Sequence, residues 1–226
     1  MRISVIIPAL DEAGNIAALV AEVYATAPVE VIVVDNGSID ATAAEAQVAG
    51  ARVVSEPRRG YGYACAAGVA TARETDVLIF LDGDYSFLPG DLPRLLKPIE
   101  QGEADLVLGS RTRGHIARGS MPPQQRFGNW LTPRLMNVLY GLAITDLGPY
   151  RAVRRSVLDQ LDMQEMTYGW PVEMIVKAAK HQARIVEVPV SYHSRRAGQS
   201  KVSGTVRGTI VAGWRILSVT LRYARR

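Results

Sequence analysis

Short apolar runs alternate with helix-like segments along the first half of the chain. Five runs are apolar and short enough to be buried strands, and in the segments between them apolar residues recur every three or four positions. The predicted strands are residues 3–7, 29–34, 52–54, 77–81 and 106–108, and the predicted helices are 14–27, 40–49, 60–73 and 92–100. This alternation predicts parallel βαβ units, and therefore an α/β fold with a doubly wound, mostly parallel sheet flanked by helices.

The pattern becomes less regular after Gly109. Residues 111–125 are rich in Arg, Gly and Pro, and residues 194–204 read "SRRAGQSKVSG", so both segments are predicted to be flexible basic loops. Between them the pattern predicts helices around 126–140 and 171–181 and a strand at 184–192. Pro189 lies inside that strand and cannot donate to a ladder, which predicts that the strand is at a sheet edge.

The last 22 residues, 205–226, predict an amphipathic basic helix. Its apolar positions at helical spacing are Val206, Ile210, Trp214, Leu217 and Leu221, and Arg207, Arg215 and Arg222 follow an adjoining face. An apolar face with Trp and flanking arginines is typical of a helix lying in a membrane interface, where arginines favour anionic headgroups. A helix packed on the domain or on a second subunit has the same pattern, and both interpretations stay open here.

Length and composition indicate one domain in a reducing compartment. The chain has 226 residues, 48% of them hydrophobic, which is enough for a sizeable core. The single cysteine, Cys65, excludes an intramolecular disulfide framework. The apolar run near the N-terminus is too short for a signal peptide, and no run reaches the length of a transmembrane helix. We therefore expect a cytoplasmic protein, at most peripheral on the inner face of the cell membrane.

The two halves of the chain carry opposite charge. Residues 1–110 hold 7 Lys and Arg against 16 Asp and Glu, a net charge of −9, and residues 111–226 hold 19 against 6, a net charge of +13. A basic half of this size indicates an anionic partner such as phosphates or a membrane surface. Nucleic acid is not expected, because no recognised binding motif or ladder of aromatics accompanies the basic residues.

Two carboxylates separated by one glycine follow the predicted strand 77–81. Asp82 and Asp84 offer hard oxygen ligands of the kind that Mg²⁺ and Mn²⁺ prefer, with substrate phosphates and water completing the coordination. An Asp-Gly turn is the alternative interpretation. Asp35 ends another predicted strand, and the carboxyl ends of parallel strands share one edge of a sheet, where ligands bind. Asp35 is thus expected near the pair, accepting hydrogen bonds from a base or ribose.

A glycine-opened helix near residue 60 is preceded by Arg58 and Arg59. Backbone N–H groups at a helix start, with cations beside them, suit a phosphate or another anion. The segment is not a P-loop, because the Gly-Lys-Ser/Thr ending is missing.

Taken together, these segments resemble the inverting family 2 glycosyltransferases with the GT-A fold, and more narrowly the polyprenyl-phosphate (dolichyl-phosphate) mannose and glucose synthases. The matching pieces, in order, are "VIIPALDE", "VIVVDNGSID", "RRGYGYACAAG", "FLDGDYS", "VLGSR", "DLGPYRAVRR", "YGWPVEM" and "RRAGQSK". The resemblance implies a glycosyltransferase domain over residues 1–204, with a nucleotide-sugar half (1–110) and an acceptor half (111–204). It implies transfer of a hexose from GDP-mannose or UDP-glucose to a phosphate acceptor.

The resemblance also assigns roles to matching positions. The expected donor-binding residues are Pro8, Glu12, Asp35, Arg59, Asp82, Gly83, Arg195 and Lys201. The expected ligands of Mg²⁺ or Mn²⁺ are Asp82 and Asp84. The expected catalytic set is Asp84, Arg111, Asp146 and Glu173. Three positions depart from the family pattern, namely Asp11, Asn36 and Ser86, where the family often has Asn, Asp and, in the mannose synthases, Gln.

One departure concerns the acceptor. Many family members that glycosylate alcohols carry Glu-Asp where this chain has Glu173 and Met174, and there the Asp serves as general base. A hydroxyl acceptor needs such a base, whereas a phosphate near pH 7 is already ionised. Met174 therefore favours a phosphate acceptor such as polyprenyl phosphate. The open alternative is a soluble hydroxyl acceptor, with Met174 in the core and Asp146 as the base.

Two other functional classes fit the sequence less well. A nucleotidyltransferase usually has a Gly-rich, cationic loop after the first strand, and "PALDEAGN" has one Gly and no cation. A non-catalytic nucleotide-sugar binder would not need both Asp82 and Asp84.

Overall fold

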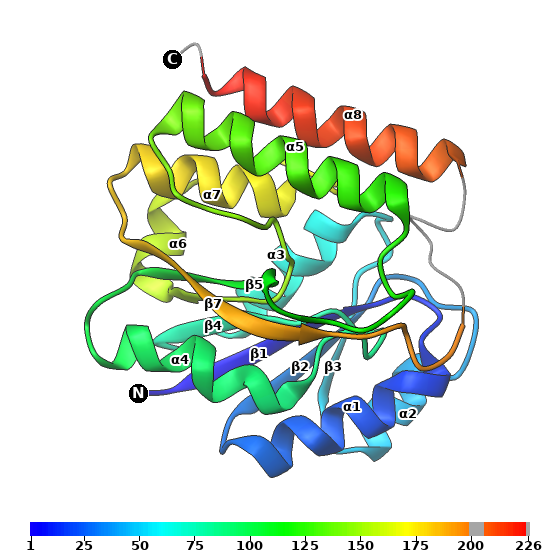
Figure 1. Cartoon of the computed structure of the whole chain (residues 1–226). Coiled ribbons are helices and arrows are strands. Elements are labelled where there is room, and N and C mark those ends of the chain that lie inside the picture. Colours follow the sequence, from blue (N-terminus) through cyan, green and yellow to red (C-terminus); the bar gives the residue numbers. More distant parts are fainter. Residues whose placement is uncertain (199–205, 225–226) are drawn as a thin grey trace.

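A single seven-stranded mixed sheet forms the centre of the computed structural model, which describes residues 1–198 and 206–224 (Figure 1). The strands are β1 (Ile3–Ala9), β2 (Glu30–Asp35), β3 (Arg52–Ser55), β4 (Val77–Phe80), β5 (Leu106–Ile116), β6 (Arg151–Arg154) and β7 (Ile185–Tyr192), in the spatial order β3-β2-β1-β4-β6-β5-β7. The first four are parallel, β6 is antiparallel to both of its neighbours, and β7 is parallel to β5. The predicted α/β fold with a mostly parallel sheet is confirmed.

Helices cover both faces of the sheet (Figure 1). On one face lie α1 (Ala13–Thr26), α2 (Thr42–Val48) and α4 (Leu92–Glu100), which follows the short 3-10 helix η1 (Pro89–Asp91). On the other lie α3 (Tyr61–Thr71), α5 (Pro123–Tyr140), α6 (Arg155–Gln160), α7 (Trp170–Lys180) and α8 (Val206–Arg222). Because each face has its own layer of helices, the sheet is buried on both sides.

The central strands are apolar at consecutive positions because both of their faces are buried. Val5 and Ile7 of β1 pack toward α1 and α4, whereas Ile6 packs toward α3 and α7. In β4, Ile79 packs on the same face as Val5 and Ile7, and Phe80 packs on the same face as Ile6. This two-sided burial fixes where β1 and β4 end, and so fixes the position of the carboxylates that follow them.

The second half departs from the sequence prediction in two places. Residues 111–116, predicted as part of a loop, continue β5, and His115 and Ile116 pair with β7 after an irregularity that follows Ser110. Strand β6 was not predicted at all. Its four residues begin and end with Arg, which conceals the apolar pair between them. Pro189 does lie in an edge strand, as predicted, because β7 ends the sheet.

The C-terminal helix is present, but two of the predicted apolar positions whose side chains the structure describes do not face the core. Ile216 and Val219 pack inward, while Trp214 and Leu221 are exposed. No helix in the described part of the chain is long and apolar enough to cross a bilayer.

Candidate active site

The carboxyl ends of β1, β2 and β4 meet at one edge of the sheet and bring the predicted donor residues together. Asp35 ends β2, and Asp82, Gly83 and Asp84 follow β4 directly. Gly83 lies close to the turn after β1, since a Cβ there would be 3.2 Å from the carbonyl oxygen of Pro8. The sheet therefore places Pro8 and the two aspartates side by side, although more than 70 residues separate them in sequence.

Asp82 and Asp84 form a pair of carboxylates with few protein donors. The Tyr61 hydroxyl donates to Asp82 Oδ1 at 3.2 Å, and the Ser86 N–H donates to Asp84 Oδ1 at 3.0 Å. Burial, and then the negative charge of Asp84, raise the pKa of Asp82 to about 7. A cation at this edge would offset both the burial of Asp82 and its repulsion from Asp84. Within the described residues no group of three or more His, Cys, Asp or Glu side chains gathers around one point.

Arg195 supplies a cation to this edge in the present structure. One guanidinium nitrogen, Nη2, lies 3.0 Å from Asp84 Oδ2 and 3.1 Å from Glu12 Oε1. Glu12 Oε2 accepts a hydrogen bond from Asn15 Nδ2 at 2.7 Å, and the same amide donates to the Ala197 carbonyl at 3.2 Å. Burial of Glu12 raises the pKa of its carboxyl. The segment at Arg195 thus lies across the carboxylates, while Lys201 is outside the described residues.

Asp35 and Arg59 both lie near the turn that follows β2. Asp35 Oδ1 accepts from the Ser38 N–H at 3.1 Å, and the Arg59 guanidinium approaches Gly37. Arg58, in contrast, forms an ion pair with Glu56 at 2.7 Å. Of the two arginines before the glycine-opened helix, Arg59 is therefore the one oriented toward the turn after β2.

Arg111 and Asp146 form a buried ion pair. Asp146 accepts from the Arg111 backbone N–H at 2.7 Å, from Nε at 2.8 Å and from Nη2 at 2.6 Å. Neither side chain is more than 7% exposed. Burial by itself would lower the pKa of Arg111. The negative charge of Asp146 has the larger effect, so the pKa of Arg111 is raised. Asn129 of α5 also accepts from Nη2, at 3.3 Å. Asp146 is therefore the counterion and hydrogen-bond acceptor of Arg111.

Glu173 lies in a separate buried network at the start of α7. Its carboxylate accepts from the backbone N–H groups of Gln164 and Glu165 at 3.0 and 2.7 Å, from Tyr223 Oη at 2.6 Å, and pairs with Lys177 Nζ at 3.0 Å. Met174 beside it is fully buried in the core. The Glu173 carboxylate therefore connects residues 164–165, before α7, with Tyr223, which follows α8.

Glu173→Gln is accordingly expected to lower the free energy of unfolding by about 2–4 kcal/mol, because it leaves Lys177 without a countercharge in a mostly buried place. Urea unfolding of the variant measures this loss. Glu100→Gln, at an exposed position in α4, is the matched control and should change stability by less than about 0.5 kcal/mol. A Glu173 variant as stable as that control would show that the network contributes little.

Sequence reasoning missed two neighbours of the carboxylates. One is Tyr61, whose hydroxyl contacts Asp82. The other is Arg151 of β6, which is buried and donates to the carbonyls of Gly148 and Pro171 at 2.6 and 2.7 Å. Burial lowers the pKa of Arg151 to about 10. The only sequence signal for Arg151 was its place in "DLGPYRAVRR", because the strand that carries it was not predicted.

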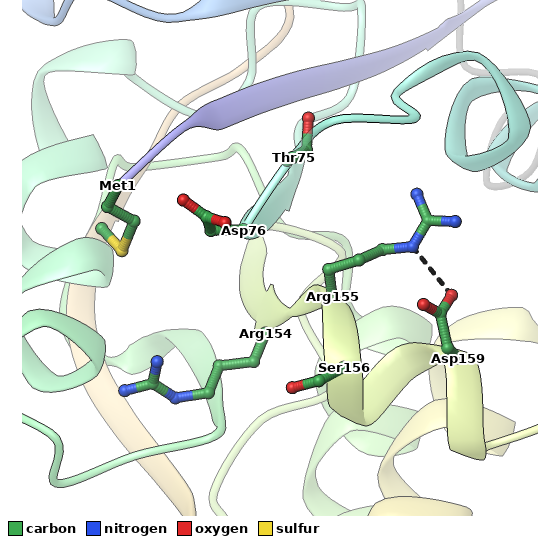
Figure 2. Close-up of a pocket in the computed structure, with 7 residues that line it drawn as sticks. All are labelled: Met1, Thr75, Asp76, Arg154, Arg155, Ser156 and Asp159. Carbon is green, nitrogen blue, oxygen red and sulfur yellow. Dashed lines mark hydrogen bonds and ion pairs between the residues drawn. The ribbon is translucent and has the colours of Figure 1, made fainter.

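A hollow at the opposite end of the strands does not compete with this site. Figure 2 shows it at the amino ends of β1 and β4, beside Met1, Asp76 and the start of α6. Its arginines already have protein partners. Arg155 Nε lies 2.8 Å from Asp159, and Arg154 Nη2 donates to the Ile99 carbonyl at 2.6 Å. Ligands of parallel α/β sheets bind at the carboxyl ends instead.

Comparison with known proteins agrees with this arrangement. The chain is 38% identical over 219 residues to an uncharacterized glycosyltransferase of Mycobacterium tuberculosis, covering 96% of this chain and 98% of the relative. It is 33% identical to an undecaprenyl-phosphate mannosyltransferase of Micrococcus luteus (93% and 91% covered) and 32% identical to a polyprenol monophosphomannose synthase of Mycolicibacterium smegmatis (90% and 82% covered).

Solved structures show the same fold. The glucosyl-3-phosphoglycerate synthase of Mycobacterium tuberculosis, crystallised with Mn²⁺, uridine diphosphate and phosphoglyceric acid, superposes with a TM-score of 0.78 at 23% identity, covering 99% of this chain and 78% of that one. The model of the family described as Glycosyl transferase family 2 matches residues 4–162 of this chain. The chain therefore belongs to glycosyl transferase family 2, and it is a hexosyltransferase with the GT-A fold.

Proposed function

We propose that this enzyme transfers a hexose from a nucleotide sugar to polyprenyl phosphate with the help of a divalent metal ion. Residues 1–110 would bind the donor and residues 111–204 the acceptor. The choice of acceptor rests on one observation, which is that both candidate general bases are already paired with cations. Asp146 is paired with Arg111, and Glu173 is paired with Lys177 and Tyr223. Neither is placed to take a proton, which suits an acceptor that is already ionised.

The donor set fits a divalent metal ion. Asp82 and Asp84 are neighbouring hard oxygen donors whose charges repel each other, and a diphosphate and water would complete the coordination of a divalent ion that they hold. When bound there, Mg²⁺ or Mn²⁺ would stabilise the negative charge that develops on the leaving nucleoside diphosphate. The relatives that act on polyprenyl phosphates and the Mn²⁺ complex of the structural neighbour support this proposal.

The protein's own groups have defined tasks in the proposed reaction. Asp35, Arg59 and Pro8 would hold the nucleotide, and Arg195 with Lys201 would close over the phosphates. An oxygen of the acceptor phosphate attacks the anomeric carbon, forming the new C–O bond as the bond to the nucleoside diphosphate breaks. No proton has to be removed from the acceptor. Arg111, anchored by Asp146, would stabilise phosphate charge at this edge.

Calorimetric titration with nucleotide sugars tests the donor half of the proposal. In the presence of Mn²⁺, either GDP-mannose or UDP-glucose should bind, and Asp35→Ala should weaken the binding about tenfold or more because a base or ribose contact is lost. Absence of binding for every nucleotide sugar tried would contradict the proposal.

Arg195→Gln is expected to strengthen the binding of Mn²⁺ to the nucleotide-free protein by a few-fold. The arginine occupies an oxygen of Asp84, and a partly exposed ion pair of this kind contributes up to about 1 kcal/mol. Electron paramagnetic resonance of free Mn²⁺ measures the change directly. Arg196→Gln is the matched control, since Arg196 lies over the Tyr85 ring. Weaker Mn²⁺ binding in the Arg195 variant would show that this side chain supports the cation site rather than competing for it.

A further inference from the structure

Helices α5 and α8 expose large apolar side chains that the core does not use. On α5, Phe127, Trp130 and Val138 are 61%, 51% and 83% exposed. On α8, Trp214 and Leu221 are 72% and 51% exposed. The three α5 residues recur at helical spacing and so lie on one stripe, and the two α8 residues are seven apart and share a face. Apolar surface gathered in this way marks an interaction site.

Arg134 lies beside the aromatic side chains of the α5 stripe. The rings of Phe127 and Trp130 are stacked with centroids 5.9 Å apart, and the Arg134 guanidinium carbon lies 4.6 Å from the centre of the Trp130 ring. Arg134 Nη1 also donates to the Trp130 carbonyl at 2.8 Å. The guanidinium of Arg134 is thus held beside the exposed aromatic rings. Arginine and aromatic side chains are arranged in this way at the boundary between an apolar layer and water.

The two helices form one layer. Figure 1 shows α5 and α8 side by side on the outer side of this face of the molecule, running in the same direction. The Tyr140 hydroxyl at the end of α5 donates to the Thr220 carbonyl of α8, and Ile216 and Val219 of α8 pack inward. The outward sides of both helices therefore belong to the same surface, which we call the α5–α8 surface.

The charge of this surface selects the partner. Helices α5 and α8 contain no Asp or Glu, and their cations are Arg126, Arg134, Arg207, Arg215 and Arg222. Aromatic and aliphatic side chains on helices whose charged residues are all arginines match an anionic bilayer, where the apolar groups enter the headgroup boundary and the cations contact lipid phosphates. We propose that the α5–α8 surface docks the enzyme on an anionic membrane.

The α5–α8 surface lies close to residues of the proposed active site. Its biological purpose rests on the proposed function. Asn129 lies on the inner side of α5, between Phe127 and Trp130 in sequence, and accepts a hydrogen bond from Arg111. The outer side of the same helical turn carries the exposed aromatics. A phosphate presented at a membrane surface would therefore be close to the Arg111–Asp146 pair.

Vesicle sedimentation tests the docking without donor or acceptor substrate. The full chain is mixed with vesicles of phosphatidylcholine alone, or of phosphatidylcholine with phosphatidylglycerol. We expect binding to the anionic vesicles that weakens with salt, and a loss of about tenfold or more in a Phe127→Ser, Trp130→Ser double variant. Ile39→Ser, Val48→Ser is the matched control, because those side chains are 92% and 90% exposed outside α5 and α8. Trp214→Ser tests the α8 part in the same assay.

Three results would overturn the docking proposal. They are absence of binding to anionic vesicles, equal binding by the α5 variant and the control, and a change from dimer to monomer in the α5 variant, which would assign the surface to a second copy. Hexose transfer to a short polyprenyl phosphate in detergent should be unchanged by Phe127→Ser, Trp130→Ser. Because that assay needs no membrane, failure of the docking proposal and failure of the proposed function give different results.

Discussion

Replacing Asp84 by alanine is expected to reduce hexose transfer at least about 100-fold while leaving the fold intact. The substitution removes one of the two carboxylates that would hold the divalent ion, and with it the stabilisation of the leaving diphosphate. Steady-state release of nucleoside diphosphate measures the loss, and Asp84→Asn should be nearly as inactive because it keeps the shape but not the charge. Little loss of stability is expected, since Arg195 retains Glu12 as a partner.

Asp159→Ala is the control for this experiment. Asp159 is also paired with an arginine, at 2.8 Å, but lies at the opposite end of the sheet in the hollow of Figure 2. Its loss should change transfer less than twofold. Transfer by Asp84→Ala within about fivefold of the unaltered enzyme would remove the carboxylate pair from the mechanism.

Breaking the Arg111–Asp146 pair is expected to have the largest effect on stability. Asp146→Ala leaves the Arg111 guanidinium buried without a countercharge, which costs about 3–5 kcal/mol in comparable pairs. The double variant Arg111→Met, Asp146→Leu removes both charges and should regain part of that free energy, because the backbone N–H of residue 111 still loses its acceptor. It should nevertheless remain inactive, because it lacks the cation that we propose stabilises phosphate charge. Urea unfolding and transfer assays on the same preparations separate the two effects.

The exposed pair Arg2–Glu74 offers the matching comparison, since its side chains are 65% and 85% exposed. Its removal should cost less than about 1 kcal/mol. If Asp146→Ala cost no more than that, or if the Arg111→Met, Asp146→Leu protein transferred hexose normally, the pair would have neither of the roles assigned to it.

The first half of the fold could be predicted from the sequence because its buried strands are continuous apolar runs. Strands β1, β2 and β4 are covered on both faces, so their central positions are mostly apolar, and a polar residue follows the apolar run at the carboxyl ends of β2 and β4. Asp35 and Asp82 were found at the sheet edge for this reason. The same reasoning failed for β6, where Arg151 and Arg154 enclose only two apolar residues, and for residues 111–116 of β5, which are mostly exposed.

The partners of the site residues could not be predicted in the same way. Arg195 meets Glu12 across 183 positions of sequence, and Arg111 meets Asp146 only because β5 and the segment before β6 are neighbours. No periodicity encodes such contacts. The resemblance to the family assigned roles to these residues, but the geometry showed which carboxylates already have a cation, and that distinction decides the proposed acceptor.

We propose that the acceptor is a lipid phosphate, and a comparison of acceptors tests this proposal. The purified enzyme, with Mn²⁺ and a panel of nucleotide sugars, is offered a short polyprenyl phosphate, the polyprenol of the same length, and soluble alcohols, and nucleoside diphosphate release is followed together with the glycosylated product. We expect metal-dependent transfer to the polyprenyl phosphate and at least about 100-fold less to the polyprenol, which would need a general base. Transfer to the polyprenol or to a soluble alcohol, with none to the phosphate, would contradict the account and make Asp146 the base to test.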